Sequence, residues 1–272
     1  MIINLEEYRQ YLKETKKAEG TIVNYMTQLR MFEKFMIANG YTGLSGEATE
    51  AYKDYLLKIK KDKVSSVNTK ITILNTYFNY LKNQKKVRRT RKLKLKKEKI
   101  QSTNDREYLI ESQYAAIYEN CVHSETQLLI KVIANSGLRI SEATGLTLDQ
   151  IKPKKIMIKN KGKWRTIGLK PELKAEIRAF FKDKKPDEPL FSLSQTTYRN
   201  RMSEAGRLAG VESELVYPHA FRHYFAKEFL RTAEDQRALR VLQVILGHSD
   251  ISTTMIYLQF SNTEVADMMI AA

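Results

Sequence analysis

Apolar residues recur at helical spacing through the first third of the chain. Their positions step by three and four residues, which predicts two long amphipathic helices. The two runs are Ile22, Met26, Leu29, Phe32 and Met36, and then Val67, Ile71, Leu74, Phe78 and Leu81. Weaker patterns at 5–11 and 47–59 complete a four-helix unit over residues 1–84. Taken alone, that unit is a generic helical bundle.

Small polar residues mark the expected ends of the two long helices. Thr21 stands in front of the first run as an N-cap, and Gly40 follows it as a C-cap. Ser65 or Ser66 precedes the second run, and either is able to cap it.

The hydrophobic pattern resumes after a turn-rich boundary at 102–105. Helical spacing predicts four helices in this half, at 111–119, 126–134, 171–182 and 194–208. Between them, Ile156 and Ile158 alternate with polar residues, a turn follows at 160–163, and a second strand at 164–167 predicts a β-hairpin. The expected fold is therefore mainly α, with one small β-hairpin in a C-terminal domain over 105–272.

Composition narrows the class of protein. The 272 residues, 42% of them apolar, are enough for two domains with cores. The single cysteine, Cys121, excludes an internal disulfide, and no apolar run approaches the roughly 20 residues that span a bilayer. The N-terminus lacks the pattern of a signal peptide, so we expect a cytoplasmic protein. The net charge of +16 favours nucleic acid over a membrane surface as its partner.

Much of this charge lies in one run, Lys82 to Lys99, which contains eleven lysines and arginines and one acidic residue, Glu98. One interpretation is a solvated linker between the domains, over 85–104, because like charges repel and keep a chain extended. The sharper one is a linker that lies against the DNA backbone and adds affinity without reading bases. Its expected DNA-binding residues are Lys85, Lys86, Arg88, Arg89, Arg91, Lys92 and Lys94.

The helix predicted at 194–208 also carries residues suited to DNA. Tyr198, Arg199, Arg201 and Arg207 could face a DNA groove, and we take Arg199 and Arg201 as DNA-binding candidates. Base contacts depend on groove geometry, so the sequence predicts no base preference.

The residues best suited to chemistry lie in the C-terminal third. His219 and Arg222 are three residues apart after Pro218, which on a helix places an imidazole and a guanidinium on one face. His248 follows Gly247 at the end of an apolar helical run. Tyr257 comes nine residues later. A lone tyrosine is most often a packing residue, so the prediction depends on the whole group.

Two further candidates precede this group. Arg139 comes two residues after Gly137 and has apolar neighbours, which is the pattern of a phosphate-binding arginine held in place by a buried segment. A surface arginine or one that caps a helix is the simpler interpretation. We expect Glu142, one turn later, to orient other groups rather than to catalyse. Lys161 would lie at the tip of the β-hairpin, where a lysine is normally just a solvated charge.

Together these segments resemble the tyrosine recombinases, the phage-integrase-like and Xer-like site-specific DNA recombinases. That family carries a Gly-Leu-Arg-x-Ser-Glu segment, a hairpin lysine, an His-x-x-Arg box, and a Leu-Gly-His box followed nine residues later by a tyrosine. The matching segments here are Gly137 to Glu142, Lys161, His219 to Arg222, Leu246 to His248, and Tyr257. The hairpin is one residue shorter than the family pattern, which leaves Lys163 as the alternative lysine.

The resemblance implies a fold and a set of roles. A core-binding domain and a catalytic domain would close as a C-shaped clamp on double-stranded DNA that carries paired sites. Tyr257 would become linked to the 3′ phosphate, Arg139 and Arg222 would hold phosphate oxygens, and His219 would be the general base. His248 would donate a hydrogen bond to the phosphate and Lys161 would be the general acid. No metal, cofactor or ATP is implied.

The resemblance also suggests a role for the last residues. The segment 261–270 has the pattern of a short capped helix, which would either fold back on its own domain or, as the resemblance implies, dock into a neighbouring protomer of a tetrameric synapse. Two other functions stay open on the sequence: a type IB topoisomerase, which would use nearly the same residues, and a non-enzymatic DNA-binding regulator.

Overall fold

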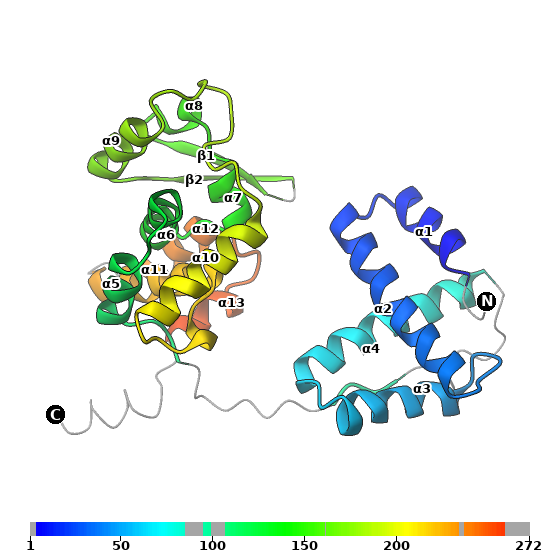
Figure 1. Cartoon of the computed structure of the whole chain (residues 1–272). Helices are drawn as coiled ribbons and strands as arrows, with labels where there is room; N and C mark the ends of the chain where they lie inside the picture. Colours follow the sequence, from blue (N-terminus) through cyan, green and yellow to red (C-terminus); the bar gives the residue numbers. More distant parts are fainter. Residues whose placement is uncertain (1–3, 85–94, 99–106, 161, 234–236, 259–272) are drawn as a thin grey trace. The chain divides into compact units, whose positions relative to one another are not determined.

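The structure is a computed structural model that describes residues 4–84, 95–98, 107–160, 162–233 and 237–258. The chain divides into two compact units, Met1–Ser102 and Thr103–Ala272, each with a hydrophobic core of its own. Figure 1 shows the elements of each unit. The domain limits expected from the sequence, at 84 and 105, stay predictions, because residues 85–94 and 99–106 lie outside the described part.

The first unit is helical, as predicted. Its elements are α1 (Leu5–Glu14), α2 (Glu19–Ala38), α3 (Gly46–Asp54) with a π-helical extension η1 (Tyr55–Ile59), and α4 (Val64–Asn83). Every apolar residue of the two long runs is buried, and these residues pack with aromatic side chains into one core. Tyr8 and Tyr77, for example, meet edge to face with their ring centroids 4.9 Å apart.

The predicted helix starts were wrong. The N-cap of α2 is Ala18 and that of α4 is Lys63, and neither side chain makes a capping hydrogen bond. Thr21 and the two serines lie within the first turns instead. The first buried apolar residue is Ile22 in α2 and Val67 in α4, each three residues after the helix begins, so the buried pattern starts later than the helix itself. Gly40 was predicted correctly as a terminator, since it follows α2 with a φ of 73°.

A short part of the basic run packs along α4. The side chain of Asn75 both donates to and accepts from the backbone of Leu95, at 2.9 and 3.0 Å, and Asn68 does the same with Glu98, at 2.9 and 2.8 Å. The two asparagines are seven residues apart, which on a helix is about 10.5 Å, and their two partners are three residues apart, which in an extended chain is roughly 10 Å. Because these two spacings match, both pairs of hydrogen bonds form at once. Leu95 is buried in the core. For Leu95 to Glu98, the interpretation as a freely solvated linker, one of the two that the sequence left open, is therefore wrong.

The second unit contains the predicted helices and the hairpin. In chain order its helices are α5 (Glu111–Glu119), α6 (Ser124–Ser136), α7 (Ile140–Thr144), α8 (Leu148–Ile151), α9 (Pro171–Phe180), α10 (Gln195–Leu208), the 3-10 turn η3 (Ser213–Leu215), α11 (Pro218–Thr232), α12 (Ala238–Leu246), α13 (Ser252–Met255) and the 3-10 turn η4 (Ile256–Leu258). Figure 1 shows the hairpin beside α8 and α9, at one end of this unit.

The hairpin pairs β1 (Ile156–Asn160) with β2 (Lys163–Ile167) in antiparallel register, so that Ile158 lies opposite Arg165. Because side chains alternate across a strand, one face carries Ile156, Ile158, Arg165 and Ile167, all buried. The other face is exposed and carries Trp164, the only tryptophan of the chain, with the Lys159 ammonium 5.5 Å from its ring centroid. An arginine thus occupies an inward position among isoleucines.

Candidate active site

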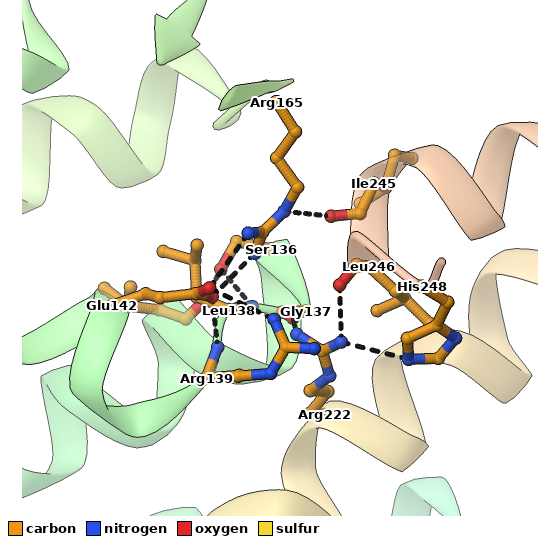
Figure 2. A network of polar contacts seen from close by, with 11 residues as sticks. Ser136, Gly137, Leu138, Arg139, Glu142, Arg165, Arg222, Ile245, Leu246 and His248 are labelled. Carbon is orange, nitrogen blue, oxygen red and sulfur yellow. Dashed lines mark hydrogen bonds and ion pairs between the residues drawn. The ribbon is translucent and has the colours of Figure 1, made fainter. Parts of the chain in front are cut away.

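Arg222 is the centre of the site and is fully buried. It lies in the second turn of α11, which begins with Pro218. Its Nη1 donates to the carbonyl of Gly137 at 2.6 Å, and its Nη2 donates to the carbonyl of Leu246 at 2.7 Å (Figure 2). Burial lowers the pKa of the guanidinium to about 10, and the nearby charge of Arg139 adds to this effect. The group therefore keeps its positive charge at neutral pH.

The turn that presents the carbonyl of Gly137 requires glycine. Gly137 ends α6 with a φ of 64°, in the left-handed region that side chains disfavour. A Cβ at this position would lie 2.5 Å from the ring of Phe225 and 2.9 Å from Leu246. The Gly-Leu-Arg segment is thus a close-packed corner between α6 and α7 that lies against α11 and the end of α12.

Arg139 begins α7 beside its partner Glu142. The carboxylate of Glu142 accepts from the backbone N–H of Arg139 at 2.8 Å and from its Nη1 at 3.1 Å. The first bond closes the exposed start of the helix, as a glutamate in the first turn often does. The side chain of Arg139 stays 30% exposed, whereas that of Glu142 is 5% exposed. Arg139 is therefore anchored at one side and open at the other, and Glu142 orients it as expected.

The same carboxylate binds a second arginine, which the sequence analysis did not select. Arg165 donates from Nη1 and Nη2 to the two oxygens of Glu142, at 2.8 and 2.6 Å, and from Nε to the carbonyl of Ile245 at 2.7 Å. Figure 2 shows Glu142 between the guanidinium groups of Arg139 and Arg165. The inward position of an arginine on the hairpin was the signal that could have identified it.

His248 lies at the turn after α12, where Gly247 has a φ of 65°. Its Nε2 is 3.2 Å from Nη2 of Arg222, and its Nδ1 is 2.9 Å from the hydroxyl of the buried Thr254. Arginine only donates, so Nε2 accepts and the proton is assigned to Nδ1. Burial, followed by the charges of Arg222 and Arg139, lowers the pKa of His248 to about 4. The imidazole is neutral at pH 7 in this structure.

Tyr257 lies in η4 and is 4% exposed. Its ring packs with Ala226, Leu242 and Leu246, and it lies 6.5 Å from the ring of His248. Its hydroxyl is 2.8 Å from Nδ1 of His223, a buried residue that the sequence analysis passed over. His223 follows Arg222 and lies one turn beyond His219, which was the available signal.

The remaining candidates have different surroundings. His219 is exposed at the start of α11, and its ring centroid is 4.8 Å from that of His223. Lys161 lies outside the described residues, whereas Lys163 is exposed on β2. On α10, Arg199 is exposed and Arg201 is half-buried. Tyr198 does not face a groove, because it is fully buried and donates to Glu125.

The charges that meet at this site suit a phosphate. The guanidinium groups of Arg139, Arg165 and Arg222 outnumber the one carboxylate that binds two of them, Glu142. A desolvated surplus of fixed positive charge stabilises an anion that gains charge during a reaction. Among the residues described, no three His, Cys, Asp or Glu side chains gather as a metal site would need, and no helix is long and apolar enough to cross a membrane.

Comparison with known families agrees with this geometry. Residues 107–264 match the phage integrase family, and residues 5–85 match the SAM-like N-terminal domain of phage integrases. The first match covers more than half of the chain. The chain belongs to the phage integrase family. Its two matched regions correspond to the two units of the fold, and it is a tyrosine-type site-specific DNA recombinase.

Relatives in the phage integrase family extend over nearly the whole chain. It is 28% identical to the tyrosine recombinase XerA of Pyrococcus furiosus, over 93% of this chain and 88% of that protein. It is 25% identical to the tyrosine recombinase XerD of Shewanella oneidensis, over 92% of this chain and 89% of that one.

Solved structures share the fold. A lambda integrase dimer bound to a COC′ core site matches with a TM-score of 0.73 at 16% identity, over 93% of each chain. XerH recombinase bound to its difH substrate matches with a TM-score of 0.68 at 21% identity, over 97% of this chain and 83% of that one.

Proposed function

We propose that Tyr257 is the nucleophile by which this recombinase cleaves DNA. Its oxygen attacks the scissile phosphorus, the bond from phosphorus to O5′ breaks, and the protein becomes linked to the 3′ phosphate. The bond energy is kept in the phosphotyrosine, so a 5′ hydroxyl from another strand can reverse the step without ATP. The observation that carries this proposal is the convergence of Tyr257, His248 and Arg222, which hydrogen bonds and ring contacts bring together.

Arg139 and Arg222 bind the phosphate. Arg222 is held by two backbone carbonyls, and the remaining N–H groups of its planar guanidinium can donate to a non-bridging oxygen. Arg139 contributes its exposed side. Both charges are fixed before the phosphate arrives, so they need not reorganise as the transition state gains charge. His248 also donates to the phosphate, once the phosphate's negative charge favours its protonated form.

Two proton transfers complete the reaction. His219 accepts the proton of Tyr257 as general base, since its exposed imidazole can approach substrate at the start of α11. Lys161 gives its proton to the departing O5′, with Lys163 as the alternative. Both lysines belong to the segment that includes the hairpin turn and the start of β2, so the general acid comes from the hairpin in either case.

The DNA partner follows from the charge and from the family. We propose that the protein binds double-stranded DNA with paired sites and that the basic run over 85–94, together with Arg199 and Arg201, contacts its backbone. Lambda integrase and XerH, the structural neighbours, were solved bound to DNA. Assembly into a tetramer through residues 261–270, and the closing of the two domains as a clamp, belong to the same proposal.

A suicide substrate tests the reaction. A nicked duplex that carries the candidate site from beside the coding region lets the short cleaved strand diffuse away, so the covalent complex accumulates. Wild type should give a complex that survives a denaturing gel, and Tyr257→Phe should give none. No adduct from wild type, despite tight binding to that DNA, would refute the proposal and favour a non-enzymatic regulator.

A further inference from the structure

Arg165 bonds to two separate segments of the phosphate-binding site. Through Glu142 it reaches α7, where Arg139 begins the helix, and through the carbonyl of Ile245 it reaches the last turn of α12, next to His248. It does so from β2 of the hairpin, with 8% of its surface exposed. Figure 2 shows its guanidinium between these two segments.

Only an arginine can make this set of bonds. The two terminal nitrogens match the two oxygens of the Glu142 carboxylate, while Nε points to a third acceptor at the side. A lysine has one nitrogen, so it would keep the charge and reach only one of the two segments. The end of α12 is close-packed on this side chain, because a Cβ on Gly247 would lie 3.0 Å from Cδ of Arg165.

Arg165 also determines how much charge Arg139 offers to the phosphate. Glu142 accepts from both guanidinium groups, so its negative charge is shared between them. Without Arg165, the buried carboxylate would have Arg139 as its arginine partner and would draw that guanidinium away from the phosphate. This effect concerns only the phosphate clamp, the pair of guanidinium groups of Arg139 and Arg222 that binds the phosphate.

A second effect concerns the hairpin. Two of its inward side chains, Ile156 and Ile167, pack by apolar contact, which resists sliding far less than directed hydrogen bonds do. Among the inward side chains of the described hairpin residues, Arg165 is the one that donates hydrogen bonds to α7 and α12. Lys163 is two residues away on the same strand, and Lys161 is four residues away in the sequence. A shift of β2 at Arg165 would therefore move Lys163 directly, and the proposal extends this to Lys161.

We propose that Arg165 is a positioning residue that holds the hairpin, and with it the general-acid lysine, in register with the phosphate clamp. This inference rests on the proposed function, in which Tyr257 attacks and a hairpin lysine protonates O5′. A misplacement of about 1 Å can slow a reaction about 100-fold, and general acid catalysis contributes about 10²–10⁴-fold.

The leaving group separates the two effects. In the natural substrate the bond from phosphorus to O5′ breaks and the lysine gives its proton to that oxygen. With sulfur in place of O5′, the bond from phosphorus to sulfur breaks and the sulfur leaves as a thiolate, because a thiol pKa of about 8.5 lies far below that of an alcohol. A variant that lacks only the general acid should therefore recover on the sulfur substrate, whereas one that lacks the phosphate clamp should not.

The test measures single-turnover adduct formation on matched oxygen and sulfur suicide substrates. Arg165→Ala should be slowed about 100-fold on oxygen and come within about tenfold of wild type on sulfur, where only the weaker effect through Arg139 remains. Lys161→Ala or Lys163→Ala should show the same recovery, and Arg139→Ala should stay slow on both. Arg178→Ala, which removes an exposed arginine on α9, is the matched control and should behave as wild type.

Arg165→Lys supports the test in case the alanine variant does not fold. This variant keeps the charge and can bond to only one of the two segments, α7 or α12. Adduct formation on the oxygen substrate should therefore be slowed less than in Arg165→Ala, and on the sulfur substrate its rate should again approach that of wild type. The inference is overturned if the Arg165 variants are slowed equally on both substrates, or are not slowed at all, while a hairpin lysine variant recovers on sulfur. If neither lysine variant recovers, or if Tyr257→Phe still forms the adduct, the proposed function fails instead.

Discussion

The hydroxyl of Tyr257 lies 2.8 Å from Nδ1 of His223, and both side chains are buried. The tyrosine is thus held inside the protein by an imidazole that belongs to the same helix as Arg222. The proposed attack on a phosphate would require this hydroxyl to exchange its contact with His223 for one with the substrate, so the energy of the contact would enter the barrier to cleavage.

A double-mutant cycle measures this contact. His223→Leu should lower the free energy of unfolding by about 1–3 kcal/mol, because it removes a buried partner of the hydroxyl. In the background of Tyr257→Phe the same change should cost less, with a coupling energy of about 0.5–3 kcal/mol by urea denaturation. Tyr41→Phe, in the first unit, is the control. A coupling no larger with Tyr257→Phe than with Tyr41→Phe would show that the contact contributes nothing to stability.

Gly137 should tolerate no side chain. Gly137→Ala should destabilise the protein by about 2–4 kcal/mol, because it adds left-handed strain and a collision with Phe225. Gly210 provides a matched control, since its φ is 68° and nothing lies within 4 Å of a Cβ there. Gly210→Ala should therefore show only the strain. Equal shifts of the unfolding midpoint for the two variants would contradict the close packing at Gly137.

The lowered pKa of His248 makes stability depend on pH in a defined window. The pKa falls from 6.5 in the unfolded chain to about 4 in the folded one, so between these values the unfolded chain binds the extra proton. The stabilisation is complete above pH 6.5 and is lost as the pH falls toward 4. The free energy of unfolding should fall more steeply over this range for wild type than for His248→Gln. Identical profiles for wild type and His248→Gln would contradict this prediction.

The basic run should control the salt dependence of DNA binding. Each phosphate that the protein neutralises contributes about 0.9 to the slope of log affinity against log salt concentration. Replacing Arg88, Arg89, Arg91 and Lys92 with glutamine should therefore flatten that slope, by about 0.9 for each phosphate that is no longer neutralised. Filter binding or anisotropy between low and moderate salt measures it. An unchanged slope would favour the solvated interpretation of residues 85–94.

The elements that could be predicted from the sequence are those marked by a periodic pattern of apolar residues or by residues adjacent in the chain. Among the described residues, helices lie where apolar residues recur at helical spacing, and the hairpin lies where they alternate. The short helix expected at 261–270 lies outside those residues. The two long-helix caps were wrong because Thr21 and the serines before Val67 fit a cap equally well within a first turn. The pairing of Leu95 with Asn75 joins segments 20 residues apart and left no local pattern.

For the site, the family boxes select Arg139, Arg222, His248 and Tyr257 as candidates from the sequence alone, and their catalytic roles stay predictions. They did not identify Arg165, whose partners Glu142 and Ile245 lie 23 and 80 residues away in the chain. His223 was passed over for a related reason, because its contact with Tyr257 spans 34 residues. Residues that act through a partner become visible only when the fold brings that partner to them.

The most direct test of the central claim is to find which tyrosine carries the DNA. The protein has 15 tyrosines, so a covalent complex alone does not identify the nucleophile. The adduct from the suicide substrate can be digested with nuclease and protease, and the nucleotide-bearing peptide sequenced by mass spectrometry. We predict a 3′-phosphonucleotide on Tyr257 and on no other residue. The same modification on a different tyrosine, or one on a serine or lysine, would contradict the mechanism.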